Sequence, residues 1–180
     1  DRVAYGPLPR HWAHWKGHYI HGNKVILSYT VGNTPILEMA GAEGKSGARV
    51  LSRTFNIGRR PRDLQVRIAE SQTEVSIENG IATFKTVGSD TETYAALVGA
   101  PSRARFAAAP DGNALVLNIP REGPDPIRFK VLIGALQSPA ALVEIAKQSA
   151  PPEDLEALTH GGPTHWTEKI KTQGVKGDND

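Results

Sequence analysis

The chain contains no cysteine, and this absence removes several kinds of chemistry at once. Disulfide bonds, cysteine-rich zinc sites, cysteine nucleophiles and covalently attached c-type haem all require a thiol. Aromatic residues make up only 6% of the 180 residues. No apolar run approaches the roughly 20 residues that a membrane-spanning helix needs. The sequence therefore predicts neither thiol chemistry nor a membrane span.

A strong charge of one sign is also lacking. There are 21 basic and 19 acidic residues, for a net charge of +2. Nucleic-acid-binding domains are typically much more basic, so we expect no nucleic acid as a partner. The length and the 39% of hydrophobic residues fit one globular domain. The chain begins at Asp1 without methionine, and we expect it to be an internal or processed part of a longer protein.

Short β-rich runs separated by turn residues dominate most of the sequence. The run KVILSYTV (24–31) lies between Gly22-Asn23 and Gly32-Asn33, and such short links are typical of β-hairpin turns. This part of the chain is predicted to form a three-stranded meander. Further runs of the same kind continue at even spacing, which is typical of an all-β sandwich or barrel. We predict an antiparallel β-sandwich of about ten strands.

The residue pattern changes in the C-terminal part of the sequence and there predicts one or two short helices. Ser138 followed by Pro139 is a helix start signal, and the helical segment is expected over 138–160. We assign residues 1–166 to a single β-sandwich domain. Residues 167–180 have few apolar side chains and are predicted to be a strand or linker toward a further domain downstream.

Two stretches resemble a known family. The run GPLPRHWAHWKGHYIHGNKVILSYTVGNTPILEM (6–39) fits a pattern in which W-x-x-(Y/W)-x-G-x-Y-x-H-G leads into V-x-L-S-Y-x-V-G. It is similar to a β-rich domain of unknown function in very large exported proteins of Planctomycetes and Verrucomicrobia. The run HWTEKIKTQGVKGDND (165–180) resembles the exit segment of that domain. The matching positions in the first run are Trp12, Trp15, Gly17, Tyr19, His21, Gly22, Ser28, Tyr29, Val31 and Gly32.

This resemblance implies a location and a partner rather than a reaction. In that family a β-propeller like those of quinone-dependent sugar dehydrogenases follows the domain, often together with a c-type cytochrome. The resemblance therefore implies a periplasmic or secreted protein of the cell envelope, with a β-propeller-like downstream domain as partner. It transfers no catalytic residue and no cofactor to this chain, and we expect none here.

The stretch HWAHWKGHYIHG (11–22) holds four of the six histidines at helical spacing. Gly17 and the Gly-Asn turn argue against a helix. As a regular strand, alternation would place Trp15, Gly17, Tyr19 and His21 on one face and His14, Lys16, His18 and Ile20 on the other. We predict no native metal site; His14 and His18 are the weak candidates. The expected role of His21 is a hydrogen bond that shapes the turn.

Aromatic and basic residues give the candidate ligand contacts. Trp12, Trp15 and Tyr19 could stack on sugar rings or plug one end of the sandwich. The loop NIGRRPRD (56–63) carries three arginines, whose planar forks suit carboxylate, sulfate or phosphate groups. It could equally be a solvated loop or a salt-bridge patch. The candidate glycan contacts are Trp12, Trp15, Tyr19, Arg59, Arg60 and Arg62.

The sequence contains few features of known catalytic sites. The sequence has no GxSxG, no HExxH, no P-loop and no GxGxxG followed by a helix. Glu38 with Glu43, or Glu70 with Glu74, could pair as glycosidase carboxylates. We predict a non-catalytic accessory or docking module of a larger sugar-processing, oxidoreductase-like protein, which binds a polysaccharide, an acidic glycan or the neighbouring domain. The alternatives are a glycan-active enzyme on a β-sandwich scaffold and a purely structural spacer.

Overall fold

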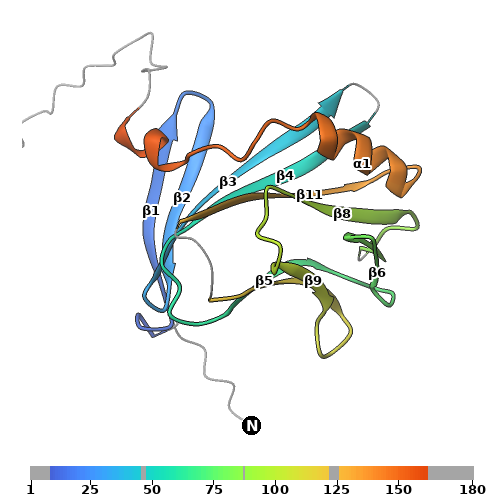
Figure 1. Ribbon diagram of the computed structural model, residues 1–180, viewed down its shortest axis with the longest axis horizontal. Coiled ribbons are helices and arrows are strands. Elements are labelled where there is room, and N and C mark those ends of the chain that lie inside the picture. Colours follow the sequence, from blue (N-terminus) through green and yellow to red (C-terminus); the bar gives the residue numbers. More distant parts are fainter. Residues whose placement is uncertain (1–8, 46–47, 87, 122–125, 162–180) are drawn as a thin grey trace, which may run out of the picture.

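The computed structural model describes residues 9–45, 48–86, 88–121 and 126–161. These residues form eleven strands, one α-helix and one 3-10 helix (Figure 1). The elements in chain order are β1 (Ala13–His21), β2 (Lys24–Val31), β3 (Thr34–Lys45), β4 (Ala48–Ile57), β5 (Leu64–Glu70), β6 (Ser76–Glu78), β7 (Ile81–Lys85), β8 (Glu92–Val98), β9 (Arg105–Ala108), β10 (Ala114–Ile119), β11 (Ile127–Ala135), α1 (Pro139–Gln148) and η1 (Glu156–His160).

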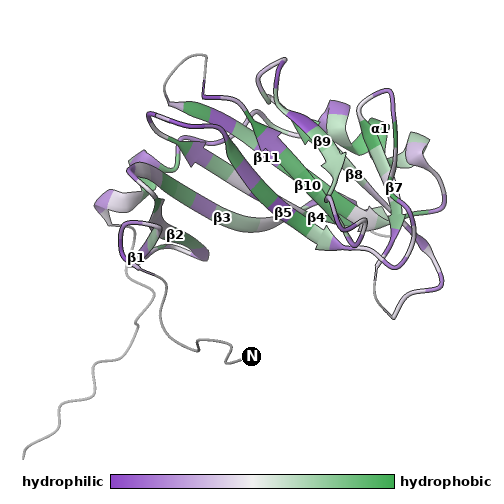
Figure 2. Ribbon diagram, turned by 90° about the horizontal axis from the view of Figure 1, so that it is seen from below, coloured by the Kyte–Doolittle hydropathy of each residue, from purple (hydrophilic) through white to green (hydrophobic). Residues whose placement is uncertain are grey.

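The strands make two antiparallel sheets of unequal size. The large sheet has eight strands in the order β1-β2-β3-β4-β11-β8-β7-β6, and the small sheet has three in the order β5-β10-β9. The predicted all-β, antiparallel class is confirmed. The small sheet lies below the middle of the large one, and the β1–β2 hairpin lies beyond the area that it covers (Figures 1 and 2).

The main core lies between the two sheets. Phe55 and Phe129 from the large sheet pack with Phe106, Leu115 and Leu117 from the small sheet. The face of the large sheet that meets this core is called the inner face below. The opposite face, which α1 and η1 cover in part, is called the outer face.

Helix α1 packs on the outer face over β8 and β11. Its buried Leu142 contacts a cluster of Val50, Tyr94, Ala96 and Leu132. The predicted start at Ser138 and Pro139 is confirmed, although the Ser138 side chain makes no capping hydrogen bond. Pro139 favours the helix start in another way: its φ is fixed near the helical value, and it has no N–H to leave unsatisfied at the first position.

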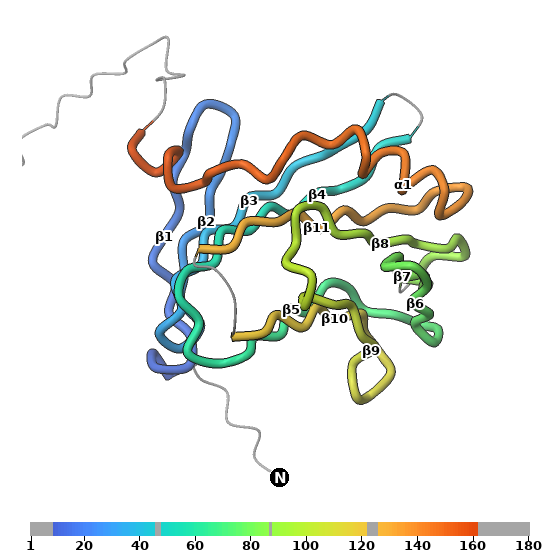
Figure 3. Tube along the Cα trace, in the orientation of Figure 1, coloured from blue at the N-terminus to red at the C-terminus, as the bar shows by residue number. Residues whose placement is uncertain are grey.

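An extended segment, residues 150–155, crosses the outer face from α1 to η1 and is called the strap (Figure 3). Its two prolines explain why the helical signals of this region produce two separate short helices, since proline cannot continue a helix. Leu155 at the end of the strap and Leu158 in η1 pack on Ile26 and Met39. The strap thus ties the end of the described chain to the first two hairpins.

The predicted turns are confirmed by their backbone angles. Gly22 and Gly32 have φ values of +65° and +56° at the ends of β1 and β2, so the three-stranded meander is present. Asn79 and Gly80 also have positive φ, as the turn between β6 and β7 requires. Neither helix in the described part of the chain has the length and apolar character of a membrane span. The predicted segment 167–180 lies outside the described residues.

Candidate functional site

A β-bulge in the first strand decides where the histidines and aromatics point. In the pairing of β1 with β2, Trp15 faces Tyr29 and Gly17 faces Ser28, so Lys16 is an extra residue. Gly17 has a φ of +125°, a conformation that favours glycine. The simple alternation expected for this stretch is therefore wrong, because one inserted residue exchanges the two faces.

The bulge separates the two candidate metal ligands. His14 pairs with Thr30 on the outer face, whereas His18 pairs with Leu27 on the inner face. Within the described ranges, no group of three or more metal-ligating side chains converges. The Nδ1 atom of His21 is buried and has no hydrogen-bond partner there either. The turn-shaping hydrogen bond expected of His21 is therefore not formed through this atom.

The same bulge separates the aromatic candidates. Trp15 lies on the inner face, and Tyr19, which pairs with Ile26, lies on the outer face. Trp12 precedes the strand, where its backbone N–H donates to the Pro9 carbonyl. Tyr19 therefore shares no stacking platform with Trp15, and the three side chains do not line one common site.

The inner face of the β1–β2 hairpin is an exposed apolar surface. Its four large side chains, Trp15, Ile20, Val25 and Val31, are called the apolar strip; each is 38% to 61% exposed. Ile20 pairs directly with Val25, so the two lie side by side. Most of the strip is uncovered, because the small sheet approaches this hairpin only near Val31, where Leu64 lines the same groove (Figure 2).

The three arginines of the loop after β4 have different surroundings. Arg60 is only 4% exposed, and it donates to the carbonyls of Pro120 and Gly58. It therefore holds the loop rather than a ligand, which corrects its place among the glycan contacts. Arg59 and Arg62 are exposed.

Trp12 and Arg62 line one groove of about 570 Å³, called the tryptophan groove below. The groove forms where the lead-in to β1, the β2–β3 turn and the β4–β5 loop meet. The Gly32 N–H donates to the Trp12 carbonyl at 2.8 Å, which fixes the tryptophan beside the turn. The other lining residues are His11, Val31, Gly32, Asn33, Thr34, Pro61, Asp63 and Leu64.

The polar groups of the tryptophan groove are partly fixed by the fold. Asp63 accepts a hydrogen bond from the Arg121 backbone N–H at 2.7 Å, which leaves lone pairs free toward the groove. Arg62 makes no ion pair with another described residue. A flat indole, a free guanidinium and an amide from Asn33 thus share one surface. The sequence predicted Trp12 and Arg62 as ligand contacts. It did not predict Asn33 and Asp63, because asparagine and aspartate at these positions indicate only a turn or loop.

The carboxylates do not form the first predicted glycosidase pair. Glu38 shares the inner face with its partner Phe55, whereas Glu43 is paired with Val50 on the outer face. Both are neutralised: Arg53 donates to Glu38 at 2.7 Å, and Lys130 donates to Glu43 at 2.7 Å. The hypothesis of a Glu38–Glu43 pair is therefore wrong.

Glu38 also accepts a hydrogen bond from the Tyr29 hydroxyl at 2.7 Å. Burial, and then the Glu38 carboxylate, raise the pKa of Tyr29 well above its ordinary value. The phenol therefore stays protonated and remains a donor at neutral pH. The Arg53 guanidinium lies over the Phe55 ring, 5.0 Å from its centroid. This network stabilises the inner face, because its hydrogen-bond donors and acceptors satisfy one another.

Residues 1–38 match the family described as Domain of unknown function (DUF6797). The match supports the resemblance to a domain of unknown function that the N-terminal motif predicted. It includes β1, β2 and the beginning of β3, together with Trp12 and the apolar strip. No curated protein matches the chain.

Proposed function

We propose that this chain is a non-catalytic, glycan-binding accessory module of a larger exported sugar-processing protein. The observation that carries the proposal is the tryptophan groove, in which Trp12 and Arg62 come together from positions 50 residues apart in sequence. The exported, periplasmic or secreted setting and a β-propeller-like neighbouring domain rest on the resemblance of the N-terminal segment.

The chemistry of the groove suits an acidic glycan. Trp12 is 61% exposed, so its indole offers a flat apolar face for the C–H side of a sugar ring. The free fork of Arg62 can hold a carboxylate or sulfate with two parallel hydrogen bonds. Among the described lining residues, Asp63 is the single carboxylate. Glycoside hydrolysis generally uses a pair of carboxyl groups, so the lining supports binding rather than cleavage.

We expect Trp12→Ala to weaken binding to an acidic polysaccharide about tenfold, which corresponds to the loss of one aromatic contact of ~1.4 kcal/mol. Affinity gel electrophoresis against alginate, pectate and sulfated polysaccharides measures this effect. Trp15→Ala is the matched control, because it removes a similarly exposed indole that does not line the groove. Equal losses in the two variants, or no retardation of the unmodified chain by any glycan, would contradict the proposal.

A second candidate function is docking onto another folded domain of the same polypeptide, and the apolar strip favours it. Contiguous exposed apolar surface is a common sign of an interaction site. The strip adjoins β1, which pairs with no second strand among the described residues and is the first strand of the large sheet. An exposed sheet edge beside apolar side chains can pair with a strand of a neighbour.

Docking predicts protection of the β1–β2 hairpin in a longer polypeptide. We expect amide hydrogen exchange of residues 13–31 to be slower there than in the 180-residue chain. The double variant Ile20→Ser/Val25→Ser should restore fast exchange, while changing the stability of the 180-residue chain by less than about 1 kcal/mol, because both side chains are exposed. Equal exchange of the hairpin in both contexts would rule out docking through this strip.

A further inference from the structure

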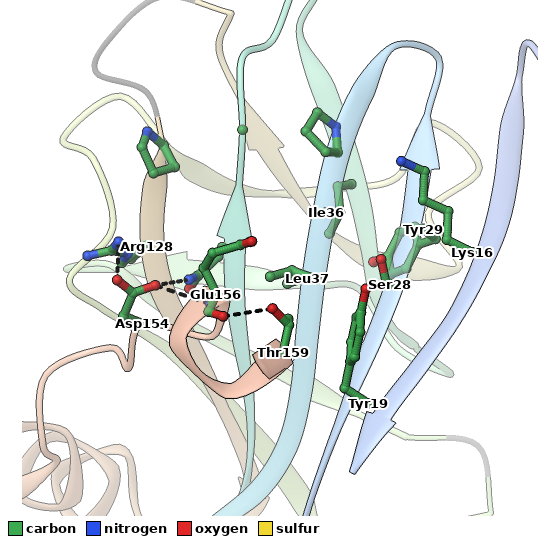
Figure 4. A pocket seen from close by; sticks show the side chains of 14 residues that line it. Lys16, Tyr19, Ser28, Tyr29, Ile36, Leu37, Arg128, Asp154, Glu156 and Thr159 are labelled. Carbon is green, nitrogen blue, oxygen red and sulfur yellow. Dashed lines mark hydrogen bonds and ion pairs between the residues drawn. The ribbon is translucent and has the colours of Figure 1, made fainter. Parts of the chain in front are cut away.

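A second pocket, of about 400 Å³, lies on the outer face and is called the outer pocket (Figure 4). Strand β1 forms one wall with Lys16 and Tyr19, and η1 forms the opposite wall with Glu156 and Thr159. It shares no lining residue with the tryptophan groove. The outer pocket and the tryptophan groove are therefore two separate sites.

The floor of the outer pocket carries a hydroxyl group that lacks a partner. Ser28 is only 8% exposed, and it lines the pocket beside Leu37 (Figure 4). Its hydroxyl makes no hydrogen bond to any other residue in the described part of the chain. The hydroxyl opens into the pocket and is not sealed in the core, so it is available to a polar ligand or water there.

The charges of the outer pocket balance. Arg128 donates to Asp154 at 2.6 Å, so this pair neutralises itself. Lys16 on one wall and Glu156 on the other form no ion pair with another described residue. One free donor and one free acceptor thus face a common space without a net charge. This arrangement suits a neutral ligand that can both accept and donate hydrogen bonds.

The pocket is also preformed. The Asn56 amide donates to the Glu153 carbonyl at 3.0 Å and accepts from the Leu155 N–H at 2.7 Å, the orientation that satisfies both groups. Lys24 adds an ion pair to Glu153. These bonds and the packing of Leu155 hold the strap, and therefore the η1 wall, on the sheet. A ligand would enter without a large ordering cost.

From these features we propose that the outer pocket binds one neutral pyranose ring. The Tyr19 ring, 41% exposed, stacks on the C–H face of the sugar. Ser28, Lys16 and Glu156 bind hydroxyl groups of the ring. A volume of about 400 Å³ lies near the lower end of the range for small-molecule sites, about 300–1,000 Å³, and fits a single ring rather than a chain. This site is independent of glycan binding in the tryptophan groove.

The test is titration of the isotope-labelled chain with methyl glycosides of glucose, mannose and galactose, followed by NMR. We expect at least one of them to shift the backbone amides around Ser28 and Tyr19. Ser28→Ala should weaken that binding about tenfold, because it removes one buried hydrogen bond and little volume. Tyr19→Ala should weaken it similarly, whereas Tyr19→Phe keeps the ring and most of the affinity.

Trp12→Ala separates this site from the tryptophan groove: it should leave methyl glycoside binding unchanged. If Trp12→Ala abolishes the shifts, the sugar binds in the groove and the outer-pocket proposal is wrong. It is also overturned if no methyl glycoside produces shifts, if only glucuronate or glucosamine does, or if Ser28→Ala binds as tightly as the unmodified chain. Thermal unfolding of each variant confirms that it is folded.

Discussion

Replacing Phe129 with alanine is expected to lower the free energy of unfolding by about 3–5 kcal/mol, the usual cost of removing a buried aromatic ring. Phe129 is fully buried on β11, and its ring stacks on that of Phe55 with centroids 5.2 Å apart. It belongs to the core cluster that joins the two sheets. Its loss leaves a cavity that the surrounding strands cannot close, because they are held by their ladders on both sides.

Urea denaturation followed by tryptophan fluorescence and circular dichroism measures this effect. Ile77→Ala is the control, because Ile77 is an exposed apolar residue on the edge strand β6 and should change stability little. Phe129→Leu should lie between the two. A loss below about 1 kcal/mol for Phe129→Ala would mean that the small sheet is not packed on this ring, since cavity formation in a core of this kind costs more.

Local signals explain which parts of the fold could be predicted from the sequence. The turns at Gly22 and Gly32 were predicted correctly because their residue types tolerate positive φ. The pairing of β11 with β4 and β8 could not be predicted in this way. Those partners lie far apart in sequence, and no local preference selects between the possible strand orders.

The bulge shows how one residue limits predictions of a site. Alternation places Trp15 and Tyr19 on one face, but the extra residue at Lys16 puts them on opposite faces. Gly17 was a visible signal, because an isolated glycine in a strand often marks a bulge. The residue types of the tryptophan groove, Trp12 and Arg62, were predicted. Their meeting depends on the packing of a loop against a turn, which residue types alone do not determine.

Glu43→Ala is expected to cost about 3 kcal/mol of stability, because it leaves the Lys130 ammonium buried without its counter-charge. Lys130 lies on the outer face with its side chain 8% exposed, and its Nζ atom is 2.7 Å from a Glu43 carboxylate oxygen. Its other contact in the described chain is the Ser149 hydroxyl at 3.3 Å, just beyond α1. A single neutral acceptor cannot replace a carboxylate for a desolvated ammonium group.

The double variant Glu43→Leu/Lys130→Met separates two quantities: the destabilisation caused by an unpaired buried charge, and the net contribution of the ion pair to the free energy of unfolding. It removes both charges and fills the space with apolar atoms, so it should recover most of the stability that Glu43→Ala loses. Glu144→Ala is the control: its partner Lys147 is 67% exposed, and the loss should be below about 0.5 kcal/mol. Urea denaturation compares all three. If Glu43→Ala is no more costly than Glu144→Ala, water reaches Lys130, and the junction between α1 and the strap is looser than its contacts indicate.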